Sequence, residues 1–205
     1  MAQAAYTTVA APAAAEFVEK RSRFIGQIAP VSTPEEAAEF MGGVRAQHRE
    51  ASHHCYAYVL RQGGLQRFSD DGEPSGTAGR PILEVVRREG LVDAAGGLTR
   101  AYAQGAKCAV DAARVLRMRP AVVVGVDADY AQYGKITHLL PGFGAAVLDT
   151  RFTQGVRLTL LLPRERLDAF ARALGELSAG AVAPLILEEK MAPFDGDSPD
   201  GTRRT

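Results

Sequence analysis

The chain has 205 residues, 46% of them hydrophobic, and its 24 basic side chains balance its 24 acidic ones. This length suits one large domain or two small ones, and the composition excludes a largely disordered chain. The zero formal net charge argues against a global field that attracts nucleic acid or an anionic membrane. Any nucleic-acid contact must therefore come from a local patch.

Cysteine usage and the N-terminal residues indicate the compartment. Cys55 and Cys108 lie in different segments without a CxxC spacing, which fits a reducing environment. Residues 1–15 lack the basic segment and apolar core of a signal peptide, and the longest apolar runs are far shorter than a membrane span. We therefore expect a cytoplasmic protein without a membrane partner.

The first 118 residues predict one domain of mixed helices and strands. Thr33 to Glu36 offers a capping hydroxyl, a proline in the first turn and a glutamate three residues after the cap. The expected elements are strands at 17–18, 24–31, 53–60 and 65–68 and helices at 33–47, 81–88 and 97–118.

Residues 119–194 predict a second domain. The expected elements are a strand at 121–126, a helix at 130–140, strands at 144–152 and 156–162, a helix at 164–177 and a strand at 182–189. This βαββαβ order is the pattern of ferredoxin-like domains. The polar tail, 195–205, has no apolar periodicity and is expected to be disordered.

The segment from Asp70 to Pro81 carries the densest chemistry of the chain. It holds three glycines, two prolines, three carboxylates, two hydroxyls and one arginine. Glycines permit a positive φ or a close approach by another molecule, and loops on a rigid scaffold commonly carry binding sites. We consider a ligand site and a purely structural turn, and favour the site. Its candidate binding residues are Asp70, Asp71, Glu73, Ser75, Thr77 and Arg80.

A second candidate lies at Gly96 and Gly97, which are predicted to open the helix over 97–118. A glycine-flanked helix N-terminus presents free backbone N–H groups to a phosphate. Arg100, one turn into that helix, is placed for a bidentate contact. Ordinary helix initiation is the alternative interpretation.

Several catalytic and metal sites are disfavoured by the residue spacing. The sequence has no GxxxxGK[ST] phosphate loop, and Ser75 is not part of a GxSxG motif. The loop carboxylates lack the spacing of an EF-hand. Cys55 beside His53 has the composition of a nucleophile pair, but a buried small hydrophobe is the favoured interpretation. We therefore predict no catalytic residue, no metal and no cofactor.

Four motifs resemble one protein family, in the same order along the chain. They are Lys20–Ile25, His53–Tyr58, Ser69–Pro81 and Gly96–Tyr102. The Ser69–Pro81 motif is long enough to be specific. On these motifs the chain resembles the bacterial two-domain branch of the IMPACT/YigZ (UPF0029) family over residues 16–190.

The resemblance implies an α+β fold and a role in translation. The N-terminal domain would be similar to domain 2 of ribosomal protein S5, and the C-terminal domain to a ferredoxin-like domain of elongation factor G. We therefore expect a non-catalytic binding or regulatory protein that contacts RNA or a ribosome-linked partner. The alternatives are a hydrolase or phosphate-handling enzyme that uses the Asp70–Arg80 loop, and a protein-interaction adaptor.

The chain departs from the family between Val92 and Gly97. Relatives carry a buried strand and an aromatic, glycine-rich turn there, whereas only Ala94 and Ala95 stand between Asp93 and Gly96 in this sequence. Loss of a core strand leaves neighbouring strands with unpaired backbone groups. We therefore predict that the sequence lacks a segment at this point; a true deletion with a rearranged sheet is the alternative.

Overall fold

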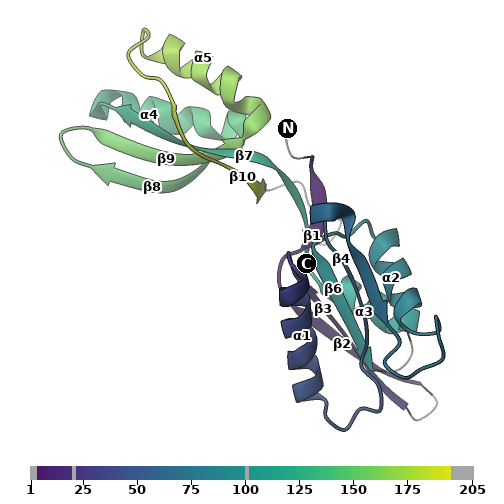
Figure 1. The fold of residues 1–205 in the computed structure, drawn as a ribbon. Coiled ribbons are helices and arrows are strands. Elements are labelled where there is room, and N and C mark those ends of the chain that lie inside the picture. The colour runs from purple at the N-terminus through teal and green to yellow at the C-terminus, as the bar shows by residue number, and fades with distance from the viewer. Residues whose placement is uncertain (1–3, 20–21, 100–101, 195–205) are drawn as a thin grey trace. The chain divides into compact units, whose positions relative to one another are not determined.

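The computed structural model describes residues 4–19, 22–99 and 102–194 (Figure 1). The described chain separates into two compact units that meet in sequence between Leu116 and Arg117. Each unit has its own hydrophobic core. The tail over 195–205, predicted to be disordered, lies outside the described residues.

The N-terminal unit is built on an antiparallel sheet of order β2-β3-β6-β4-β5. Its strands are β1 (Tyr6–Val9), β2 (Ala13–Glu19), β3 (Ser22–Pro30), β4 (Cys55–Val59), β5 (Gln66–Ser69) and β6 (Ala94–Thr99). Its helices are α1 (Pro34–Gln47), α2 (Gly79–Arg88) and α3 (Tyr102–Ala112), and a short 3-10 turn covers Gln62–Gly64. Strand β1, which was not predicted, makes a parallel bridge from Thr7 to Leu91.

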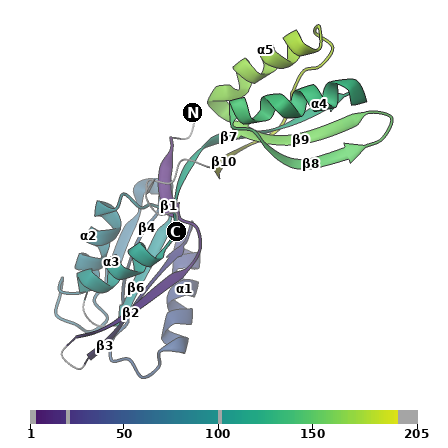
Figure 2. The same cartoon turned by 180° about the vertical axis from the view of Figure 1, so that it is seen from behind.

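Helix α1 covers one face of this sheet, and α2 and α3 cover the other (Figures 1 and 2). The predicted cap of α1 is confirmed, because the Glu36 N–H donates to the Thr33 hydroxyl at 3.2 Å. Gly26 of β3 allows α3 to pack closely, since a Cβ there would lie 2.1 Å from the Gly105 carbonyl oxygen. Close packing of α3 on β3 therefore requires glycine at position 26.

The helix predicted over 97–118 is wrong at both ends. Gly96 and Gly97 lie inside strand β6, whereas α3 covers only Tyr102–Ala112 and the next strand begins at Val115. The reason is steric: a Cβ on Gly96 would lie 3.3 Å from Ile82 of α2, and one on Gly97 would lie 3.0 Å from Met41 of α1. The two glycines let helices approach both faces of the sheet.

A core strand is present where the sequence predicted its loss, while the predicted missing segment between Val92 and Gly97 stays a prediction. Ala94–Thr99 forms strand β6 and pairs with both neighbours, for example Gly96 with Ile28 of β3 and with Ala57 of β4. The strand was not expected because alanine and glycine carry little local strand signal. Their position is decided by helices packed on both faces.

The C-terminal unit has the predicted βαββαβ order. Its elements are β7 (Val115–Ala128), α4 (Tyr130–Leu139), β8 (Ala146–Phe152), β9 (Val156–Pro163), α5 (Leu167–Leu177) and β10 (Leu185–Pro193), with 3-10 turns at Leu140–Phe143 and Arg164–Arg166. The first residues of β7 belong to the N-terminal unit. The sheet has five strands in the order β1-β7-β9-β8, with β10 also paired to β7, and the β10-β7, β7-β9 and β9-β8 pairs are antiparallel.

Both helices of this unit pack on the same face of its sheet (Figure 1). Alternate residues of β7 and β9 are fully buried under them, as the period of two in a strand requires. The largest buried side chains of this core are Ile136, Leu158, Leu160, Leu162, Phe170 and Leu174. The two units together confirm the α+β class with antiparallel sheets. In the described part of the chain, every helix is too short or too polar to cross a membrane.

Candidate functional site

The Asp70–Arg80 loop connects the end of β5 with the start of α2. The chain turns back on itself so closely that a Cβ on Gly79 would lie 2.6 Å from the Ser69 carbonyl oxygen. Gly72 and Gly76 have φ values of 89° and 77°, which glycine adopts at low cost. Each of the three loop glycines therefore has a conformational or steric function.

The Asp70 carboxylate organises the loop from within. Its Oδ2 accepts the backbone N–H of Gly76 at 2.8 Å, and its Oδ1 accepts those of Ala78 and Gly79 at 3.0 and 2.8 Å. These hydrogen bonds, that from Gly76 foremost, hold the pKa of Asp70 below its usual range. The loop is therefore assembled around an ionised carboxylate, which also accepts the first N–H of α2, that of Gly79.

The other two carboxylates are held by residues that precede β4 and by α1. Asp71 Oδ2 accepts the His54 N–H at 2.6 Å, and its Oδ1 lies 3.4 Å from Arg45 Nη2. Glu73 Oε1 lies 3.6 Å from His53 Nε2, while His53 Nδ1 lies 2.7 Å from the Asp71 carbonyl oxygen. Asp71 and Glu73 thus fix the loop against the sheet.

The outward side of the loop carries Ser75, Thr77 and Arg80, which we call the loop tip. All three residues are exposed, and the Arg80 side chain is 69% exposed. Its Nε lies 3.8 Å from Glu84, a pairing that is weak at such exposure. The Thr77 hydroxyl donates to the Pro74 carbonyl at 2.7 Å. The loop tip is thus a polar surface on a fixed backbone.

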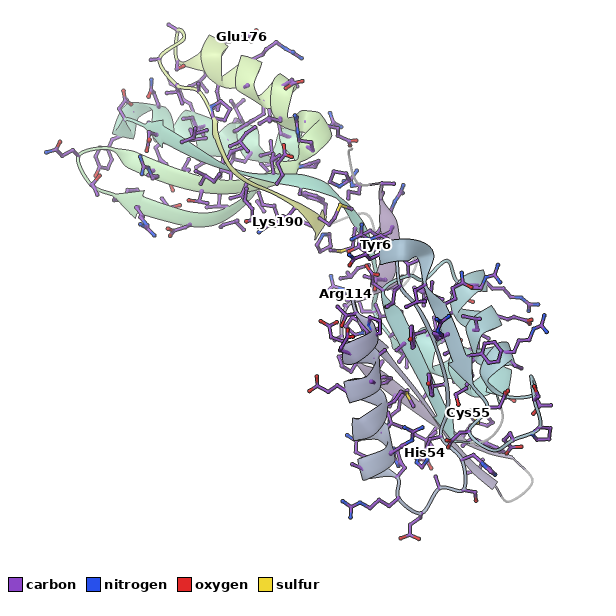
Figure 3. All side chains as sticks on the ribbon, in the orientation of Figure 1. Tyr6, His54, Cys55, Arg114, Glu176 and Lys190 are labelled. Carbon is purple, nitrogen blue, oxygen red and sulfur yellow. The ribbon has the colours of Figure 1, made fainter. Side chains whose placement is uncertain are left out.

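Cys55 lies beneath this loop and is fully buried. Figure 3 shows it beside His54, at the end of the sheet that carries the loop. Its thiol donates to the Asp70 carbonyl at 3.0 Å. Burial foremost, with Glu73, Asp71 and Asp70 nearby, raises the pKa of Cys55 to about 12. A reactive cysteine needs a lowered pKa, so the interpretation as a buried hydrophobe is confirmed.

The structure separates the two predicted candidates. Gly96 and Gly97 are buried within the sheet, and their strand pairs on both sides with β3 and β4. They do not form a helix N-terminus. Arg100 lies outside the described residues. Among the described side chains, no group of three or more His, Cys, Asp or Glu is arranged to hold a metal ion.

Sequence reasoning missed the residues that support the loop. Arg45, His53 and His54 contact Asp71 and Glu73 across sequence separations of about twenty residues. The available signal was the His53-His54 pair directly before a predicted strand. Only the pairing of β4 with β5 brings that pair next to the loop.

Comparison with known proteins places both units in one family. The family model of the Impact N-terminal domain matches residues 20–111, which include the loop, and that of a domain of unknown function, DUF1949, matches residues 126–181. IMPACT family member YvyE of Bacillus subtilis (strain 168) is 33% identical over 190 residues, covering 85% of this chain and 88% of that protein. The chain belongs to the IMPACT family.

A second relative and a solved structure also match most of this IMPACT family protein, and the relatives confirm the family indicated by its motifs. IMPACT family member YigZ of Escherichia coli (strain K12) is 33% identical over 187 residues, covering 83% of this chain and 92% of that protein. A crystal structure described only as that of a hypothetical protein is 28% identical, with a TM-score of 0.55, over 92% of this chain and 100% of that one.

Proposed function

We propose that this protein is a non-catalytic, translation-associated binding or regulatory protein whose loop tip contacts RNA or a ribosome-linked partner. The observation that carries the proposal is the fixation of the loop by Asp70, which leaves Ser75, Thr77 and Arg80 exposed on an ordered backbone. A surface ordered before binding loses less conformational entropy when its partner docks. Such a role implies a cytoplasmic location.

The chemistry of the loop tip suits a phosphate-bearing partner. The Arg80 guanidinium offers a planar set of donors for bidentate contact with phosphate. The hydroxyls of Ser75 and Thr77 add donors to phosphate or sugar oxygens. Because the chain has no net charge, this contact has to be local and helped little by long-range attraction.

The architecture of each unit supports the same proposal by analogy. The strand order β10-β7-β9-β8, with α4 and α5 on one face, supports a ferredoxin-like assignment for the C-terminal unit. The mixed sheet-and-helix N-terminal unit is compatible with the proposed similarity to domain 2 of ribosomal protein S5. Fold likeness alone does not establish function, so the loop tip carries the argument.

The hydrolase alternative lacks support from the carboxylates that it needs. A general base that works near neutral pH usually has a raised pKa, whereas the pKa of Asp70 is lowered by backbone hydrogen bonds. Asp71 and Glu73 are engaged by Arg45, His53 and His54. Their arrangement suits the support of a loop.

Affinity purification of the tagged full-length chain tests the proposal. We expect ribosomal particles or RNA to co-purify with the wild type, and nuclease treatment separates direct RNA contact from contact with a ribosome-linked protein. Arg80→Glu is expected to reduce recovery, while Arg172→Glu, an exposed arginine on α5, retains it. Recovery of neither RNA nor ribosomal particles with the wild type contradicts the proposal.

A further inference from the structure

Strand β8 forms one edge of the C-terminal sheet and pairs, in the described part of the chain, with β9 alone (Figure 2). Two of its large apolar side chains are open to solvent, Leu148 at 51% and Phe152 at 56% exposure. An edge strand also presents a row of unpaired backbone N–H and C=O groups. This combination is a template for pairing with another strand.

Two oppositely charged residues of β8 lie at equal distances on either side of Thr150. Asp149 and Arg151 flank it on one side of the sheet, with side-chain exposures of 48% and 76%. Phe152 lies one position further along the regular ladder, whereas Leu148 is the extra residue of a bulge in the pairing with β9. In an antiparallel pair, residues directly opposite each other share a face and interact. A two-fold axis at Thr150 therefore places unlike charges directly opposite each other.

We propose that β8 pairs antiparallel with β8 of a second copy of this chain, about a two-fold axis at Thr150. Asp149 then faces Arg151 of the partner subunit, and Thr150 faces Thr150 of the partner subunit. Two-fold symmetry makes the charged contact twice. The two sheets thereby continue as one across the interface. This assembly goes beyond the proposed function and does not depend on it.

The ladder between β8 and β9 fits this axis. A bulge lies between Val147 and Asp149, and the register is regular from Asp149 to Phe152. A bulge bends the strand and ends regular pairing locally. The bulge therefore limits regular self-pairing to Asp149, Thr150 and Arg151. Within its own chain Arg151 contacts Asp149 at 2.9 Å, so both side chains already lie on one face.

The β10 edge of the sheet lacks the self-complementarity of β8, so the proposal does not apply to every edge strand. On β10, Glu188 and Lys190 repeat the same spacing of opposite charges, with their side chains 3.2 Å apart. The residue between them is Glu189, so a two-fold axis there sets two carboxylates opposite each other. Like charges directly opposite are destabilising, whereas a Thr–Thr pair is favourable. The β8 edge is therefore the self-complementary one.

Sedimentation equilibrium of the full chain, from micromolar to submillimolar concentration, tests the proposal. We expect a reversible dimer in the wild type. Asp149→Arg and Arg151→Asp each place like charges opposite each other twice, and each is expected to raise the dimer dissociation constant by about tenfold. The double variant with both changes restores the opposite charges and is expected to return within about threefold of the wild type.

The matched control exchanges Glu188 and Lys190 on β10, and it is expected to leave the dissociation constant unchanged. Circular dichroism checks that all variants fold, which the exposure of the four side chains favours. A wild type that stays monomeric overturns the proposal. A dimer whose dissociation constant is unchanged by either single substitution overturns it too. So does a double variant whose dissociation constant does not return toward the wild-type value, or a β10 control that dissociates the dimer.

Discussion

Asp70 Oδ2 accepts the backbone N–H of Gly76 at 2.8 Å, across a turn in which Gly76 has a φ of 77°. This contact and the two to Ala78 and Gly79 convert a glycine-rich connection into an ordered loop. An ionised acceptor strengthens each of these bonds. The charge of Asp70 therefore determines the shape of the candidate binding surface.

Asp70→Asn is expected to destabilise the protein, because an amide replaces one acceptor oxygen with a donor that faces backbone N–H groups. The expected loss is about 1–3 kcal/mol, the cost of leaving buried donors without a partner. Urea unfolding followed by circular dichroism measures it. Glu84→Gln, at a 51% exposed side chain on α2, is the control and should change stability by less than about 0.5 kcal/mol. Equal effects of the two variants contradict this role of Asp70.

The stability provided by Asp70 should decline in acid. Its pKa is lower in the folded chain than in the unfolded chain, so its contribution is fully present above the ordinary aspartate pKa of about 3.9 and is lost as the pH falls toward the folded value. The difference in unfolding free energy between wild type and Asp70→Asn is therefore expected to stay constant down to about pH 5 and to shrink as the pH falls below about 4. A difference that stays constant or grows on acidification below that pH is the opposite result.

The two cysteines should differ in reactivity. Burial raises the pKa of Cys55 to about 12, so its thiol stays protonated near pH 8, whereas Cys108 on α3 is only partly buried. Brief treatment of the native protein with iodoacetamide should modify Cys108 and spare Cys55, with peptide mass spectrometry as the readout. Both should react in denaturant. Equal modification in the native state contradicts the burial and protonation of Cys55.

Replacing Gly26 and Gly43 by alanine should have opposite effects on the free energy of unfolding. Gly26→Ala places a methyl group against the backbone of α3, and we expect a loss of more than about 2 kcal/mol. Gly43→Ala lies within α1, where a Cβ has no neighbour within 4 Å, and should gain about 0.5–1 kcal/mol from helix propensity. Thermal and urea unfolding report both. A neutral Gly26→Ala contradicts the close packing of β3 on α3.

Elements with local signals were predictable from the sequence. The Thr33 hydroxyl caps α1 as its spacing predicts, and the alternating apolar residues of β9 and the amphipathic stripe of α5 have the expected form. Strand β6 was not predictable, because Gly96 and Gly97 carry no strand propensity and acquire their position from Met41 and Ile82 in distant helices.

The loop of the candidate site was predictable from local signals, but the residues that support it were not. The glycines and short polar side chains of the Asp70–Arg80 segment indicate an ordered loop. Its anchors, Arg45, His53 and His54, reach it only through the tertiary fold. The Gly96–Gly97 site failed because a single sequence does not distinguish a glycine that frees a helix terminus from one that admits a neighbouring helix.

The most direct test of the central claim measures how the purified full-length chain binds purified ribosomal particles over a range of salt concentrations. Arg80→Ala is compared with Arg172→Ala, a change at an exposed arginine of the other unit. We predict that the wild type binds, that Arg80→Ala weakens binding several-fold and lowers the salt slope by about 1, and that Arg172→Ala binds like the wild type. Absence of binding, or equal binding by the wild type and Arg80→Ala, contradicts the assignment of the loop tip as the contact surface.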